Sequence, residues 1–478
     1  MNVRRPMGVR GLYSAAMFSG RLLLTLTLAL GSFSCGGASS EKPNLLFVVL
    51  DTTRADHLGC FGYERRDTSP TLDALAARGV LFRSVYSQSS LTPVSAGSFL
   101  TGTWPYEHGI RSLFVVGKES LASQSPSLFE TFRTAGWQTA GFVSAKPMDR
   151  QYGLDRGFET FEDDMQSTKA EYRIGRFEDA PQRPGDVTVD LALDWLDDHG
   201  QDPFALFVHV FDAHDPSFVP PREFLEQHVS FPLPPNLGRQ WSYGAFQGPQ
   251  GLDMERLLEL YDAEIRFTDE LVGRLLTKLE DAGVLDDTVV CLIADHGESF
   301  GEHGYFTHGW MAEEQIRIPL ILAGPGLPSG AVQDTRIRAI DVAPTLCELF
   351  DLNAPAGFSG RSALGLARGE QETSQREVYA EAHHAPNDYR GRAEAMHTLI
   401  DGDWKLVHYP GPQADELFDL SADPGETRNL AESEPQTAAR LLGKLIDRRA
   451  IGGGEVDLSG LDEDQLQKLR ELGYLGED

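Results

Sequence analysis

Three short apolar runs that each end in an aspartate constrain this chain most strongly. They cover residues 44–51, 204–212 and 288–295 and end at Asp51, Asp212 and Asp295. Each run is rich in β-branched and aromatic residues and lacks polar alternation, which is typical of a strand buried on both faces of a parallel sheet. Ligand sites in open α/β sheets form at the carboxyl ends of the strands. We therefore predict that three carboxylates reach one edge of a sheet and suggest a metal site there.

Strand-like and helix-like stretches alternate from residue 44 to about residue 350, which predicts an α/β architecture. Helices are expected over residues 71–79, 187–199 and 252–281. The last of these carries the clearest apolar stripe of helical period, and Gly283 ends it just before the strand that leads to Asp295. This order predicts a helix–strand unit that leads into the metal site.

A smaller α+β subdomain is expected over residues 376–450, after a catalytic domain at 43–360. Short strand candidates lie at residues 377–382 and 404–409, and an Asp-Pro-Gly turn signal follows residue 416. A glycine-rich joint at residues 451–454 then precedes an amphipathic tail helix, which we place at residues 455–478.

Residues 1–35 have the pattern of a signal peptide. Arginines precede a short apolar stretch at residues 22–30, which is too short to span a bilayer. Cys35, followed by small residues, resembles a bacterial lipoprotein cleavage site, and residues 36–42 would be a linker. We expect an extracytoplasmic protein of the bacterial cell envelope, periplasmic or lipid-anchored. Plain secretion is the alternative.

The charge balance excludes one class of partner. The chain has 42 basic and 72 acidic residues and a net charge of −30. Because binding to a nucleic-acid phosphate backbone relies on Lys and Arg, we expect no nucleic-acid duplex as partner. The same charge opposes adhesion to anionic lipid, so membrane contact is expected only through the N-terminal anchor.

A hydroxyl stands at the start of a predicted helix at residues 92–102. Thr92 suits the N-cap, Pro93 the first helical position and Gly102 the stop. The N-terminus of a helix attracts anions, and a hydroxyl beside a metal can become a nucleophile. Taken alone, the pattern indicates only a helix cap.

Several segments together resemble the sulfatase family of the alkaline phosphatase superfamily, in order and in spacing. They are Pro43 to Tyr63, Thr92 to Gly109, Gly136 to Ala140, Gly153 to Phe158, Tyr261 to Ile265, Asp295 to Gly304 and Glu416 to Leu430. The resemblance covers nearly the whole chain after Lys42. It implies a doubly wound, mostly parallel sheet with helices on both faces and a small C-terminal subdomain with an antiparallel sheet.

The nucleophile segment departs from the pattern of sulfatases. These enzymes oxidise a Cys or Ser to formylglycine in a Cys/Ser-x-Pro-x-Arg motif, and the matching positions here are Thr92, Val94 and Ala96. Threonine cannot give that aldehyde, because its β-carbon carries a methyl group. In relatives that cleave or transfer phosphoryl groups, threonine is the nucleophile. Thr52 also replaces the second aspartate of the usual Asp-Asp pair, which weakens a calcium site.

The resemblance implies a metal held by Asp51, Thr92, Asp295 and His296. This mixed oxygen and nitrogen set suits Zn or Mn as well as Ca or Mg. Each of these residues also has a purely structural interpretation, as a cap, a turn former or a buried histidine. Asp212, His214 and His308 are candidates for a second metal site or for contact with the leaving group, although His308 equally fits a loop position. We expect Thr92, His214 and His308 to be the catalytic residues.

The sequence thus predicts a metal-dependent hydrolase of an anionic ester, preferably a phosphate mono- or diester, acting through a covalent Thr92 intermediate. Three alternatives remain open. They are a sulfatase that works without formylglycine, a phospho-group transferase and a binding protein that retains the fold without catalysis.

Overall fold

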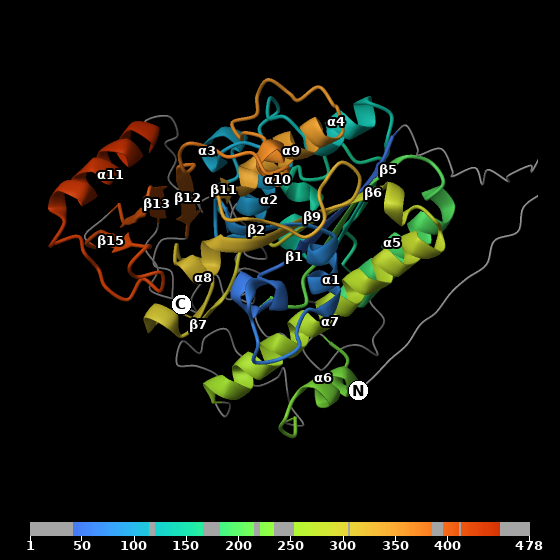
Figure 1. Ribbon diagram of the computed structural model, residues 1–478, viewed down its shortest axis with the longest axis horizontal. Coiled ribbons are helices and arrows are strands. Elements are labelled where there is room, and N and C mark those ends of the chain that lie inside the picture. The colour runs from blue at the N-terminus through green and yellow to red at the C-terminus, as the bar shows by residue number, and fades with distance from the viewer. Residues whose placement is uncertain are drawn as a thin grey trace, which may run out of the picture. The chain divides into compact units, whose positions relative to one another are not determined.

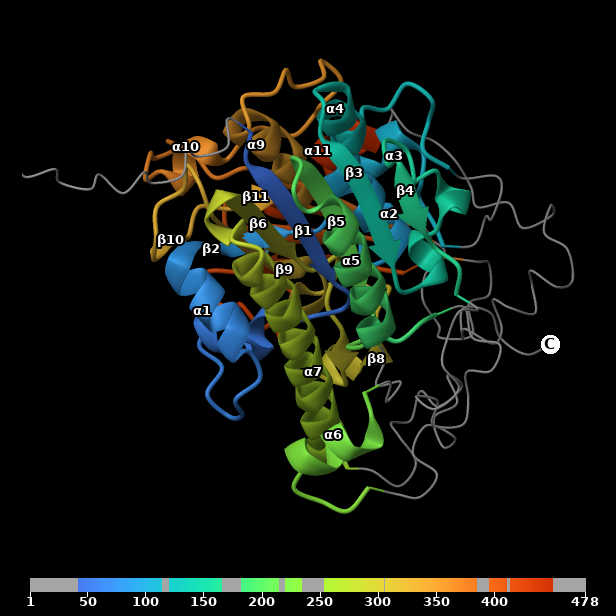
Figure 2. The same ribbon diagram turned by 90° about the vertical axis from the view of Figure 1, so that its right-hand side faces the viewer.

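A computed structural model describes residues 42–113, 120–165, 182–214, 220–233, 253–304, 306–384, 395–410 and 413–449. A nine-stranded sheet forms the centre of the α/β core, with strand order β10-β2-β9-β6-β1-β5-β3-β4, and β11 also pairs with β2 (Figures 1 and 2). The pairings are parallel except those of β9, which is antiparallel to both of its neighbours. The strands are β1 (Asn44–Leu50), β2 (Gly79–Tyr86), β3 (Gln138–Val143), β4 (Thr160–Glu162), β5 (Phe204–Val210), β6 (Thr288–Ile293), β9 (Arg317–Ala323), β10 (Ala331–Gln333) and β11 (Ile337–Arg338).

The three apolar runs form the central strands of this sheet. β1 pairs in parallel with β5 on one side and with β6 on the other, and Phe47 is opposite both Phe207 and Cys291. Every residue of the three strands is buried. Because the strands are parallel and adjacent, the segments after all three begin at the same edge of the sheet. The prediction of buried parallel strands that deliver their aspartates to one edge is confirmed.

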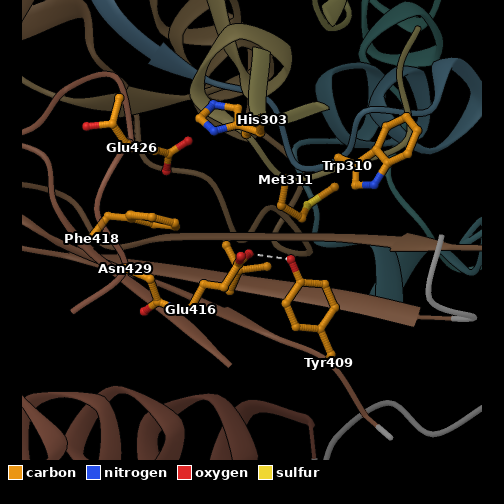
Figure 3. Close-up of a pocket in the computed structure, with 11 residues that line it drawn as sticks. His303, Trp310, Met311, Tyr409, Glu416, Phe418, Glu426 and Asn429 are labelled. Atoms are coloured by element: carbon orange, nitrogen blue, oxygen red, sulfur yellow. Dashed lines mark hydrogen bonds between the residues drawn. The ribbon is translucent and has the colours of Figure 1, made fainter. Parts of the chain in front are cut away.

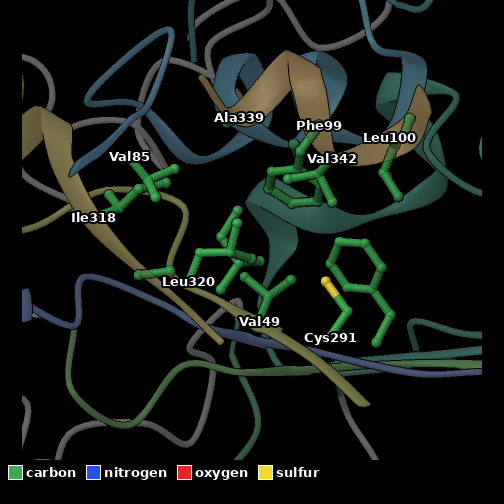
Figure 4. Close-up of a cluster of buried hydrophobic side chains, with 14 of the residues drawn as sticks. Val49, Val85, Phe99, Leu100, Cys291, Ile318, Leu320, Ala339 and Val342 are labelled. Atoms are coloured by element: carbon green, nitrogen blue, oxygen red, sulfur yellow. The ribbon is translucent and has the colours of Figure 1, made fainter. Parts of the chain in front are cut away.

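Both faces of the sheet are apolar. Leu45, Phe47 and Val49 of β1 face one core cluster, whereas Leu46, Val48 and Leu50 face another. This alternation follows from the two-residue repeat of a strand, and covering both faces requires helices on both sides. Figure 4 shows part of the first cluster, where Val49 and Cys291 of the sheet lie below Phe99 and Val342 of two helices.

Different helices cover the two faces. α1 (Pro70–Arg78), α5 (Gly185–His199) and α7 (Met254–Asp281) supply apolar residues to the cluster around Val48, and the long α7 runs across the molecule in Figures 1 and 2. The cluster around Phe47 receives residues from α2 (Thr92–Thr101), α4 (Leu128–Thr134), α9 (Val342–Leu349) and α10 (Leu364–Ala367). Three shorter helices are α3 (Pro105–His108), α6 (Arg222–His228) and α8 (Glu313–Ile316). The expected helices at residues 71–79, 187–199 and 252–281 are therefore present, within two residues of the predicted bounds.

A four-stranded antiparallel sheet follows the α/β core. Its strands run in chain order, as β12 (Val378–His383), β13 (Ala395–Asp401), β14 (Trp404–His408) and β15 (Glu416–Asp419). α11 (Pro435–Arg449) places Leu441 and Leu445 in a cluster with Tyr379 and Leu399 of this sheet. The C-terminal antiparallel sheet was expected, whereas β13 and α11 were not identified individually in the sequence.

A two-stranded hairpin extends from the core beside the C-terminal sheet. It consists of β7 (Ser299–Phe300) and β8 (Phe306–Thr307), and it leads directly to His308. The predicted signal peptide, Cys35, the glycine-rich joint and the tail helix lie outside the described residues. Within the described ranges, no helix combines the length and the apolar character needed to cross a membrane.

Candidate active site

Asp51, Asp295 and His296 converge at the carboxyl edge of the large sheet. Asp51 follows β1 directly, and Asp295 and His296 lie two and three residues after the end of β6. One side-chain ligand atom of each lies within 4.8 Å of the corresponding atoms of the other two, and all three residues are 0% exposed. The structure thus brings together three of the four residues that the sequence proposed for a metal.

The loop after Asp51 is held in a strained conformation. Thr52 has a φ of 48°, in the left-handed region that β-branched residues rarely adopt. Its backbone N–H donates to Asp295 Oδ1 over 3.1 Å, and its carbonyl accepts from the Tyr261 hydroxyl at 2.7 Å. That hydroxyl in turn accepts from the backbone N–H of Arg54. Tyr261 on α7 therefore locks the turn that places Asp51 opposite Asp295.

Thr92 stands at the first residue of α2 and faces this cluster. Its Oγ1 lies 3.2 Å from His296 Nε2 and 3.5 Å from Asp51 Oδ2. The predicted N-cap role is wrong by one residue, because Leu91 occupies the cap and no side chain caps the helix there. The Thr92 hydroxyl is directed to the acidic cluster instead. Gly102 ends the helix with a φ of 60°, as expected.

His209 on β5 is a site residue that the sequence reasoning missed. Its Nε2 lies 2.9 Å from Asp51 Oδ2, and its Nδ1 accepts from the backbone N–H of Ser144 over 3.4 Å. This partner assigns the ring proton to Nε2, which therefore donates to Asp51. Burial lowers the pKa of His209 to about 4, although the charge of Asp295 opposes the shift. The only signal in the sequence was a single histidine inside an otherwise apolar strand.

The residues of this cluster could hold a metal ion. Asp51 and Asp295 are buried carboxylates, His209 is neutral at neutral pH, and no Lys or Arg forms an ion pair with Asp295 among the described residues. Asp295 Oδ2 and Thr52 Oγ1 are buried and accept or donate no hydrogen bond within the part of the chain that the structure describes. These oxygens lie beside the carboxylates of Asp51 and Asp295 and the imidazole of His296. Carboxylates and imidazoles are the ligand types that divalent metal ions use, so the residues present fit such an ion.

His308 and His214 lie next to this cluster. The ring of His308 is 4.6 Å from the ring of His296 and 4.8 Å from that of His214, measured between centroids. His308 Nδ1 lies 3.3 Å from Oε2 of the buried Glu298. Glu298, which the sequence analysis did not assign, orients the ring of His308. The two histidines predicted to be catalytic are therefore close to Thr92's partner His296.

Asp212 is directed elsewhere. Its Oδ1 accepts from the backbone N–H of Gly185 at the start of α5 over 3.2 Å. Burial raises the pKa of Asp212 to about 7, against the opposing effect of that hydrogen bond. Among the described residues, Asp212 does not join His214 and His308 in a group whose ligand atoms converge within 4.8 Å. The second metal site stays a prediction without a preformed ligand set, because Asp212 is engaged in capping a helix.

Comparison with known proteins identifies the family. A family model described as Sulfatase matches residues 43–352, which is more than half of the 478-residue chain. The chain belongs to the sulfatase family. A second model, described as N-sulphoglucosamine sulphohydrolase, C-terminal, matches residues 301–449 of this sulfatase-family protein and includes the antiparallel sheet.

Relatives of this sulfatase-family protein share moderate identity over most of their length. It is 25% identical to an arylsulfatase of Clostridium perfringens over 452 residues, which cover 82% of this chain and 91% of the relative. It is 27% identical to a choline-sulfatase of Rhizobium meliloti over 445 residues, or 83% of each chain. These findings confirm that the protein is a hydrolase of ester bonds.

Solved structures share the fold. A phosphonate monoester hydrolase of Agrobacterium radiobacter superimposes with a TM-score of 0.69 at 20% identity, covering 86% of this chain and 96% of that chain. A protein solved with its substrate D-glucosamine-2-N,6-O-disulfate gives a TM-score of 0.69 at 20% identity, covering 86% and 98%. Both confirm the predicted α/β fold of this sulfatase-family protein.

Proposed function

We propose that this protein is a metal-dependent hydrolase of phosphate mono- or diesters in which Thr92 is the nucleophile. One observation carries the proposal. The Thr92 hydroxyl is not used for capping α2 and lies 3.2 Å from His296 Nε2, beside Asp51 and Asp295. A threonine there forms a phosphothreonine that water can cleave directly, so no aldehyde is needed.

Each residue of the site has a defined part in this proposal. Asp51, Asp295 and His296 would hold a divalent ion, and His209 keeps Asp51 in place through Nε2–H. Such an ion lowers the pKa of a neighbouring hydroxyl and neutralises ester oxygens. The N-terminus of the ten-residue helix α2 adds positive potential at Thr92.

Group transfer then takes place in two steps. The Thr92 hydroxyl releases its proton to solvent, and Oγ1 attacks phosphorus in line. The bond from Oγ1 to phosphorus forms as the bond to the leaving oxygen breaks. His308 or His214 donates a proton to that oxygen, which leaves as the alcohol. Water gives one proton to the same histidine as it attacks the phosphothreonine, which releases phosphate or a phosphate monoester. The departing Thr92 oxygen takes a proton from solvent and becomes a hydroxyl again.

Hydrolysis of sulfate esters is the second candidate. It is favoured by the relatives, which include an arylsulfatase and a choline-sulfatase. Thr92 and Ala96 weigh against it, because they replace the formylglycine precursor and the arginine of the sulfatase motif. The substrate in both cases is an anionic ester.

We also propose an extracytoplasmic location, which rests on the pattern of residues 1–35.

A substrate comparison tests the proposal. The purified protein, supplemented in turn with Zn, Mn, Mg and Ca, is assayed on an aryl sulfate, an aryl phosphate and a bis-aryl phosphate. We expect phosphate ester turnover to exceed sulfate turnover, and Thr92→Ala to lower it by roughly three orders of magnitude or more. Thr92→Ser keeps a hydroxyl and is the matched control that should retain activity. Faster sulfate turnover, or full activity of Thr92→Ala, would refute the assignment.

A further inference from the structure

A cavity lies where the β7–β8 hairpin meets the C-terminal sheet. It has a volume of about 250 Å³ and is shown in Figure 3. One wall comes from His303, Trp310 and Met311, which belong to the hairpin and the segment after it. The opposite wall comes from β14, β15 and the turn that follows β15. The volume is slightly below the range of roughly 300–1,000 Å³ of pockets for drug-sized ligands, so any occupant is small.

The lining combines aromatic rings with acidic groups. Trp310, Tyr409 and Phe418 supply three rings, and Glu416 and Glu426 supply two carboxylates. No Lys or Arg belongs to the lining among the residues that the structure describes. An aromatic ring has a negative face, and rings together with a carboxylate therefore attract a positive charge.

The two carboxylates differ in how their charge is balanced. Glu426 pairs with the buried Lys405, whose Nζ lies 2.6 Å from Oε1. Glu416 accepts a hydrogen bond from the Tyr409 hydroxyl at 2.5 Å, drawn as a dashed line in Figure 3, and forms no ion pair within the described ranges. The neighbouring base, His303, already faces Glu314, with 3.5 Å between Nε2 and Oε2. Among the described residues, the Glu416 carboxylate therefore lies on the cavity wall without a cationic partner.

We infer that this cavity binds a small organic cation, with a quaternary ammonium group against the rings of Trp310, Tyr409 and Phe418 and its charge beside Glu416. A weakly hydrated cation of this kind loses little solvation on entering a cavity lined by rings. The net charge of −30 raises its local concentration. This inference goes beyond the proposed function and does not depend on Thr92, because binding at this cavity requires no turnover.

Calorimetric titration of the full chain tests the inference. The probes are tetramethylammonium chloride and tert-butanol, which are similar in size but differ in charge, at constant ionic strength. We expect tetramethylammonium to bind at least about tenfold more tightly than the alcohol. Equal affinity for the two probes, or no binding of tetramethylammonium, would overturn the inference.

Three variants locate the binding. Glu416→Gln removes the charge at nearly constant size and should weaken tetramethylammonium binding by about tenfold. Phe418→Leu removes one ring while keeping the site apolar and should weaken it by about 3- to 30-fold. Glu348→Gln changes an exposed carboxylate of α9 and is the matched control that should bind like the wild type. An unchanged affinity in both Glu416→Gln and Phe418→Leu, with native circular dichroism, would place the cation elsewhere and refute the inference.

Discussion

Replacing Lys405 by methionine should destabilise the protein far more than the same change at a surface lysine. The Lys405 side chain is 0% exposed, and its ammonium lies 2.6 Å from Glu426 Oε1 and 3.1 Å from Glu313 Oε1. Burial alone lowers the pKa of Lys405, but the charges of Glu426 and Glu313 outweigh this effect and raise it. The ammonium is therefore charged in the folded protein and joins the C-terminal sheet to α8.

The magnitude follows from what the substitution leaves behind. Methionine fills most of the space of the lysine stem but leaves the buried Glu426 and the partly buried Glu313 without their cation. Breaking a buried ion pair by removing one partner costs about 3–5 kcal/mol. Lys444 is the matched control, because its ammonium also contacts two carboxylates, Asp401 at 2.8 Å and Glu377 at 3.1 Å, but its side chain is 43% exposed. Solvent screening limits the cost of Lys444→Met to about 0–1 kcal/mol.

Equilibrium unfolding in urea measures both variants at pH 7.5. A second variant, Lys405→Met with Glu426→Gln, should regain part of the lost stability because one of the two stranded charges is gone. Equal destabilisation by Lys405→Met and Lys444→Met would refute the reasoning. So would a double variant that is less stable than Lys405→Met alone.

Three further predictions concern the edge of the large sheet. Asp295→Asn should reduce bound divalent metal, measured by elemental analysis after dialysis, by at least about tenfold while circular dichroism stays native; metal retained at wild-type stoichiometry would contradict the assigned ligand. His209→Phe should lower the affinity for the metal by about 10- to 100-fold by leaving Asp51 without its donor, as metal titration would show, and an unchanged affinity would mean that His209 only fills space. Asp212 has a folded pKa of about 7 against an ordinary value of 3.8, so its contribution to stability is present below about pH 4 and is lost as the pH rises through 7. Asp212→Asn should therefore flatten the dependence of unfolding free energy on pH between about 4 and 7, and an unaltered slope would refute the raised pKa.

Most of the catalytic framework could be predicted because it depends on local pattern. Buried parallel strands are apolar along their whole length, and chain order alone places Asp51 and Asp295 just after two of them. His296 was found because it adjoins Asp295, whereas Thr92 was assigned to the nucleophile position by the resemblance of its segment to the sulfatase motif. These inferences required no knowledge of which segments meet across the fold.

Residues whose partners are distant in the chain were missed or assigned to the wrong partner. His209 is 158 residues away from Asp51 in the sequence. It contacts Asp51 only because β5 pairs with β1 in the sheet. Asp212 ends an apolar run just as Asp51 does, yet its carboxylate accepts a hydrogen bond from the backbone N–H of Gly185 in α5. β13 was not recognised because its place in the sheet is decided by its pairing with β12 and β14 and not by its own sequence.

The sequence by itself determined the α/β class, the strand ends that carry the acids and the presence of a hydroxyl in place of a formylglycine precursor. The first two depend on residues that are neighbours in the chain, and the third depends on the resemblance of the segment around Thr92 to the sulfatase motif. Only the tertiary structure decided that the Thr92 hydroxyl faces His296 and not its own helix, that His209 donates to Asp51 and that Asp212 accepts a hydrogen bond from Gly185. The physical reason is that a buried polar group must find a partner, and which partner lies within reach depends on how distant segments pack.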